Sequence, residues 1–125
     1  MDVLLEQAIA PVMRDLVRSG IAPPRLLDYD WLDDTAVASA MLHTPDGAGT
    51  GITVSRLATE AEQVAWVADA VQEAVIDYLM PTGPNNWPPC PLHPRNHPLL
   101  AAVHDEAAVW ECPKTGSRVA AIGAV

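Results

Sequence analysis

Residues 87–98 of the chain read WPPCPLHPRNHP, and residues 110–116 read WECPKTG. Both cysteines of the chain and three of its four histidines lie between Cys90 and Cys112. Residues 81–98 also hold seven prolines, a density at which neither a helix nor an inner strand can form. We therefore expect this part of the chain to be an extended connection, with the regular elements of the fold on either side of it.

The segment before the connection predicts two helices. Apolar residues recur at helical spacing over residues 5–17, and Gly20 marks the end of that pattern. A second helix begins with a capping box, in which Thr59 caps the helix and Glu62 reaches back to the cap. We expect this helix to run to about residue 79. Its buried stripe is predicted to consist of Val64, Val67, Val71, Ala74, Val75 and Tyr78.

Strand patterns occupy both halves of the chain. Residues 36–43 and 51–57 flank a turn rich in glycine, which predicts an antiparallel hairpin. After the connection, residues 99–103, 107–111 and 118–122 are separated by short turns. This spacing predicts a three-stranded antiparallel meander, which can extend the sheet of the hairpin.

Residues 25–34 mix apolar side chains with four aspartates and predict a short strand followed by a turn. The glycine and the terminal glutamate of an EF-hand loop are missing, so a calcium loop is not supported. We expect a solvated acidic surface that Trp31 anchors to the protein.

Together these elements predict an α+β fold, in which two helices flank a β-hairpin and are followed by the proline-rich connection and the meander. At 125 residues the chain has the size of one domain. We expect that domain to comprise an acidic part (residues 1–80), the connection (81–98) and the meander (99–125).

The charge of the chain is uneven. Residues 1–80 hold thirteen acidic residues against four arginines, whereas residues 81–125 hold three acidic and three basic residues. An acidic surface repels the phosphates of nucleic acids and of anionic membranes, so we expect neither as a partner. The sequence shows no signal-peptide pattern at its start and no run long enough to span a membrane, which predicts a cytoplasmic protein.

The cysteine and histidine spacing predicts a metal site. Cys90 and His93 form a C-x₂-H pair, and eighteen residues separate this pair from Cys112, which begins a C-P-x-x-G turn. Zinc takes four tetrahedral ligands, usually thiolates and imidazoles supplied in pairs by tight turns. Gly116 can adopt the positive φ angle that such a turn requires. The pattern therefore indicates bound zinc.

Over residues 87–122 the chain resembles a zinc ribbon with one incomplete knuckle. It departs from that family at Thr115, where a cysteine would complete the second ligand pair. The resemblance implies a structural zinc ion, and we expect His97 to supply the fourth ligand, with His104 or a water molecule as alternatives. The layout W-x-x-C-P-x-H-P … W-x-C-P also resembles small uncharacterised proteins of high-GC, actinobacterial-type bacteria, which implies no activity.

The predicted site therefore consists of Cys90, His93, His97 and Cys112, with zinc as the cofactor and no catalytic residues. We expect a small intracellular protein whose zinc-bearing module binds another protein or a second copy of itself. Two alternatives remain. One is a metal-dependent hydrolase with an open zinc position, and the other is a metal-free interaction domain whose zinc site has decayed at Thr115. A Cys-His nucleophile is disfavoured because no third, orienting group is evident.

Overall fold

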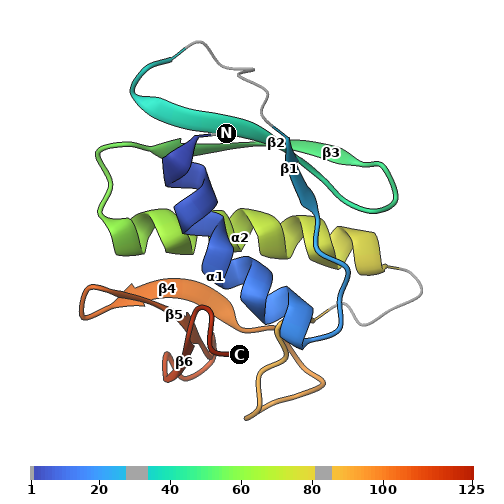
Figure 1. Ribbon diagram of the computed structural model, residues 1–125. Helices are drawn as coiled ribbons and strands as arrows, with labels where there is room; N and C mark the ends of the chain where they lie inside the picture. Colours follow the sequence, from blue (N-terminus) through green and yellow to red (C-terminus); the bar gives the residue numbers. More distant parts are fainter. Residues whose placement is uncertain (1, 28–33, 81–85) are drawn as a thin grey trace.

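The computed structural model describes residues 2–27, 34–80 and 86–125 (Figure 1). The elements are α1 (Val3–Arg18), β1 (Arg25–Leu27), β2 (Val37–His43), β3 (Gly49–Ser55), α2 (Glu60–Leu79), β4 (Leu100–His104), β5 (Ala107–Glu111) and β6 (Arg118–Ala121). The predicted α+β class is confirmed. The predicted turn with its aspartates and Trp31 lies largely outside the described residues.

Two three-stranded antiparallel sheets enclose the helices. One sheet has the order β1-β2-β3 and the other the order β4-β5-β6. Figure 1 shows the first sheet on one side of the helices and the second sheet on the other, and α2 contacts strands of both. The meander is therefore a separate sheet and does not extend the hairpin's sheet. It packs on the far side of the helices because α2 buries side chains in both directions.

Helix α1 begins and ends with local signals. The carboxylate of Asp2 accepts a hydrogen bond from the N–H of Leu4, which caps the first turn. At the other end Gly20 has a φ of 73°, and the N–H of Ile21 donates to the carbonyl of Leu16. This is the Schellman arrangement, which a glycine in the left-handed region makes possible. Pro11 lies inside the helix and does not divide it.

The first sheet adds a strand to the predicted hairpin, because β1 pairs antiparallel with β2. Along β2 the inward side chains Ala38, Ala40 and Leu42 are buried, and Ile52 and Val54 of β3 are buried beside them. The alternation of small and branched residues lets the helices approach this face closely.

Helix α2 has the predicted capping box: Thr59 accepts from the N–H of Glu62, and Glu62 accepts from the N–H of Thr59. The buried residues include three of the predicted stripe, Val67, Val71 and Val75, together with Ala68 and Gln72. Burial of Gln72 was not predicted, and it reflects the second sheet on that side of the helix.

The meander matches its prediction to within about two residues. The β4–β5 turn consists of Asp105 and Glu106, both with positive φ angles, as a two-residue hairpin turn requires. Among the described residues, no helix has the length and apolar character needed to cross a membrane.

Candidate metal centre

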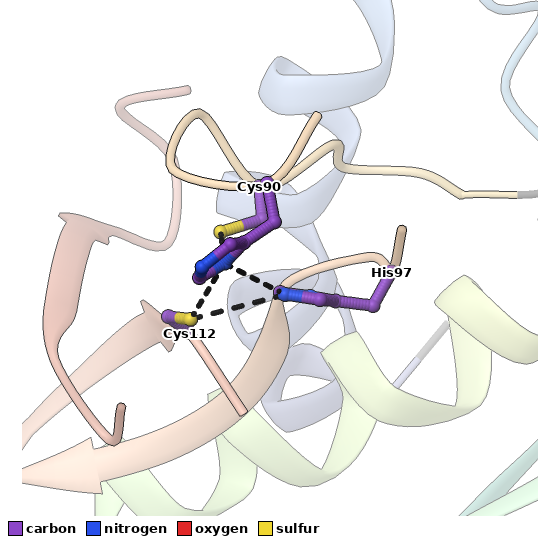
Figure 2. Close-up of side chains that lie close together, drawn as sticks. Cys90, His97 and Cys112 are labelled. Atoms are coloured by element: carbon purple, nitrogen blue, oxygen red, sulfur yellow. Dashed lines mark hydrogen bonds between the residues drawn. The ribbon is translucent and has the colours of Figure 1, made fainter. Parts of the chain in front are cut away.

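The structure brings together the four residues that the sequence singled out. One ligand atom from each of Cys90, His93, His97 and Cys112 lies within 4.8 Å of the other three. Both cysteines are fully buried and both histidines are half-buried. Figure 2 shows Cys90 and His97 reaching from the proline-rich loop toward Cys112, which follows β5.

The proline-rich loop forms consecutive turns that carry three of these side chains. The N–H of His93 donates to the carbonyl of Cys90 at 3.1 Å, and the N–H of Asn96 donates to the carbonyl of His93 at the same distance. Each turn reverses the chain, so His93 and His97 return to the side on which Cys90 lies. The prolines around them restrict the backbone and keep the loop in this path.

The second turn of the site starts at Cys112. The N–H of Gly116 donates to the carbonyl of Cys112 at 2.7 Å, and the N–H of Cys112 donates to the carbonyl of Ser117 at 2.9 Å. Gly116 has a φ of 71°, as expected for the last position of such a turn. The predicted C-P-x-x-G knuckle is therefore present.

The pKa of the Cys112 thiol is lowered mainly by groups of the same turn. The hydroxyl of Thr115 is the main cause that lowers the pKa of Cys112 to about 6, and the N–H groups of Thr115 and Lys114 act in the same direction against the effect of burial. These donors favour the thiolate, which is the form that binds metals. Thr115, which stands where a zinc ribbon has a cysteine, lies within this turn, and its hydroxyl is 2.9 Å from the hydroxyl oxygen of Ser117.

Four of the six distances between the candidate ligand atoms are close to those of a tetrahedral zinc site. With bonds of about 2.3 Å to sulfur and about 2.0–2.1 Å to nitrogen, the tetrahedron has edges of about 3.6 Å from sulfur to nitrogen and about 3.3 Å from nitrogen to nitrogen. The Sγ atom of Cys112 lies 3.6 Å from Nδ1 of His93 and 3.9 Å from Nε2 of His97. The Sγ of Cys90 lies 3.8 Å from Nδ1 of His93, and the two imidazole nitrogens are 3.0 Å apart. Each of these four distances is within about 0.4 Å of the corresponding edge of the tetrahedron.

The imidazole of His97 has its tautomer set by the main chain. Its Nδ1 lies 3.0 Å from the carbonyl oxygen of Pro98. A carbonyl can only accept, so Nδ1 carries the hydrogen of the neutral ring and Nε2 keeps its lone pair toward the cluster. A second hydrogen bond of this kind is typical of histidines that bind metals.

His104, the alternative fourth ligand, lies elsewhere. Its Nε2 is 2.8 Å from Oε1 of Glu111, across the β4–β5 hairpin. This contact also engages the carboxylate of Glu111, the residue before Cys112. Within the described ranges, the cluster that could hold a metal ion therefore consists of Cys90, His93, His97 and Cys112, without His104.

A tryptophan anchors each cysteine-bearing segment to α1. The indole N–H of Trp87 donates to the hydroxyl of Ser19 at 3.0 Å, and the indole N–H of Trp110 donates to Oδ2 of Asp15 at 2.8 Å. The two rings meet edge to face with centroids 5.8 Å apart. Cys90 follows Trp87 by three residues and Cys112 follows Trp110 by two, so this contact joins the two segments that carry the cysteines.

Gln72 of α2 holds the two ends of the proline-rich loop. Its Nε2 donates to the carbonyl of Trp87 at 3.0 Å and to the carbonyl of Leu99 at 2.6 Å. The described part of the loop is closed further by the N–H of Leu99, which donates to the carbonyl of Pro88 at 2.7 Å. Neither Gln72 nor Asp15 was predicted, because a single polar residue in an amphipathic helix ordinarily belongs to its solvent face.

A scan against protein-family models found no match, and searches of curated proteins and of solved structures found none either. The resemblance to proteins of high-GC bacteria receives no support from these comparisons. The resemblance to a zinc ribbon rests on the Cys/His cluster and on the antiparallel meander that carries Cys112.

Proposed function

We propose that Cys90, His93, His97 and Cys112 bind one zinc ion, and that this ion has a structural role in a protein that acts by binding another protein. The convergence of four ligand atoms within 4.8 Å carries the proposal. Two thiolates and two imidazoles form a donor set that suits zinc, and carboxylate-binding cations such as Mg²⁺ and Ca²⁺ prefer oxygen.

The position of the site explains what the ion would stabilise. It would join the proline-rich loop to the turn after β5, two segments that lie far apart in sequence. Zinc bound in this way adds its binding free energy to folding, because the ligands are not assembled in the unfolded chain. Zinc binds neutral imidazoles and thiolates. The tautomer of His97 and the lowered pKa of Cys112 support the proposal for these two residues.

A structural role is favoured over hydrolysis by the number of ligands. A catalytic zinc ion keeps one position open for water, whereas four protein ligands fill the tetrahedron. The geometry also argues against a decayed site, because Nε2 of His97 lies 3.0 Å from Nδ1 of His93 and 3.9 Å from Sγ of Cys112, both close to the edges of a zinc tetrahedron.

The test measures zinc in the purified full-length chain and in variants of each ligand. We expect one zinc ion per chain in the wild type, and loss of zinc in Cys90→Ser, Cys112→Ser, His93→Asn and His97→Asn. The matched control is His104→Ala, which removes a histidine of the same half of the chain that lies outside the cluster and should leave the zinc content unchanged.

A chelator supplies the second readout. Removal of zinc should lower the melting temperature of the wild type to that of Cys112→Ser, because both lack the same contribution to folding. A wild type that carries no zinc after reconstitution, or that melts at the same temperature with and without chelator, contradicts the proposal.

A further inference from the structure

A groove of about 290 Å³ opens between the first turns of α2 and the outer strand β3. Its apolar wall includes Val37, Val54, Ala58 and Trp66. Trp66 is 64% exposed, although a tryptophan is ordinarily covered over most of its surface. An exposed indole beside an apolar groove is typical of a surface that binds a partner.

The strand beside this groove has a free edge. The N–H of Arg56 donates to the carbonyl of Ala36, so in the antiparallel ladder the even-numbered residues of β3 face β2 and the odd-numbered residues face outward. The outward carbonyl of Ser55 accepts from Nε2 of Gln63. No hydrogen bond within the described ranges uses the outward groups of Gly51 or Thr53. These groups can pair with an added strand.

Charge decides which strand fits. On α2, Glu62 precedes Trp66 by four residues and Asp69 follows it by three, so both share its side of the helix. Arg56, the cation nearest in sequence to the groove, forms an ion pair with Asp2 at 2.6 Å. A second copy of the chain would bring two such acidic surfaces together, which like-charge repulsion disfavours. A basic segment would meet opposite charge, and an arginine could also stack on the indole.

We propose that the β3 edge and the Trp66 groove bind an extended, basic segment of a partner protein. The segment adds a strand along Gly51 and Thr53, places an apolar side chain in the groove and sets an arginine or lysine over Trp66. This inference deepens the protein-binding part of the proposed function, and it does not depend on the zinc ion, because none of the four metal ligands lines the groove.

The test selects random 12-residue peptides from a display library on the zinc-loaded full-length chain. We expect the enriched peptides to alternate apolar and basic residues. Synthetic copies should shift the NMR amide signals of residues 51–55 and the indole signal of Trp66. Trp66→Ala should weaken their binding about tenfold or more, as expected for a central aromatic contact. Met80→Ala, which removes another exposed apolar side chain of the described chain, is the matched control and should leave peptide binding unchanged.

A second variant tests the strand edge. Thr53→Pro removes an outward N–H while the N–H groups that face β2 remain, and it should also weaken binding about tenfold. Zinc content and melting temperature are measured on the same samples to show that both variants fold.

Each of the following results would contradict the inference. Peptides that bind Trp66→Ala as tightly as the wild type would place the binding surface elsewhere and leave the protein-binding function standing. Enrichment of acidic peptides would contradict the charge argument, and shifts of residues 51–55 that grow with protein concentration alone would assign the edge to a second copy. Absence of any enrichment would count against both this surface and the protein-binding function, while the zinc measurement would still stand.

Discussion

Trp110 donates its indole N–H to the carboxylate of Asp15 at 2.8 Å, and both side chains are fully buried. The same carboxylate accepts the main-chain N–H groups of Gly123 and Val125, at 2.8 and 2.9 Å. A single residue of α1 therefore fixes the end of β5, next to Cys112, and the segment after β6. All three partners donate an N–H group, and the carboxylate of Asp15 offers only acceptor oxygens, so each contact pairs a donor with an acceptor.

Removing one donor from Asp15 should cost measurable stability. Trp110→Phe keeps an aromatic ring and loses the N–H, and we expect a loss of about 1.5–3 kcal/mol because a hydrogen bond to a buried charged group is broken. Asp15→Asn should cost more, since its amide N–H₂ would face N–H donors. Urea unfolding of the zinc-loaded protein measures both changes.

The control for this comparison is Trp66→Phe, which alters a tryptophan on the surface and should change stability by no more than about 0.5 kcal/mol. Equal urea midpoints for Trp110→Phe and the wild type would show that the Asp15 contact contributes nothing.

A substitution of Gln72 tests how α2 supports the proline-rich loop. Gln72→Met preserves the length of the side chain and removes the donor shared by the carbonyls of Trp87 and Leu99. We expect a loss of about 1–3 kcal/mol, because buried acceptors lose a partner. Gln63→Met is the matched control, since Gln63 makes one exposed hydrogen bond of the same kind to Ser55. A larger loss from Gln63→Met than from Gln72→Met, measured by urea unfolding, would contradict this account.

Thr115 tests the distinction between a ligand and a supporting residue. Thr115→Val keeps the shape of the side chain but removes the hydroxyl that is the main cause of the lowered pKa of Cys112. We expect one zinc ion still to bind, with an affinity reduced about 10–100-fold, as is usual when a hydrogen bond to a metal ligand is lost. Competition with a chromophoric chelator measures the change, and Thr115→Ser should restore the affinity. Loss of zinc stoichiometry in Thr115→Val would instead make Thr115 a ligand.

The sequence predicted the features that depend on neighbouring residues. The capping box at Thr59, the end of α1 near Gly20 and the knuckle at Cys112 each follow from residue types within one or two turns, so local chemistry decides them. The clustering of Cys90, His93, His97 and Cys112 was likewise anticipated, because ligand pairs in tight turns approach each other once a meander joins them.

Features that depend on distant contacts were not predicted. Asp15 and Gln72 lie on helices with clear apolar stripes, and their burial follows from the second sheet. The sequence predicted the order of the strands of this sheet along the chain, but not the position of the sheet against the helices.

The capping box of α2 gives the fold a pH dependence that can be measured. The N–H of Thr59 donates to the carboxylate of Glu62, and this bond, with the Thr59 hydroxyl, lowers the pKa of Glu62 below its ordinary value. A carboxylate whose pKa is lowered in the folded state stabilises that state above the unfolded pKa, about 4.3 for glutamate, and the contribution disappears as the pH falls through the folded pKa. Glu62→Gln keeps an acceptor for the cap but does not titrate, so it is the reference.

We expect the melting temperature of the wild type to fall relative to that of Glu62→Gln between about pH 5 and pH 3, and the difference between them to stay constant above about pH 6. Every other titratable group is the same in the two proteins, so the difference between them isolates Glu62. Thr59→Ala removes the cap itself and should cost about 1 kcal/mol at neutral pH. A difference between wild type and Glu62→Gln that does not change with pH would mean that the Glu62 contact is not held in solution.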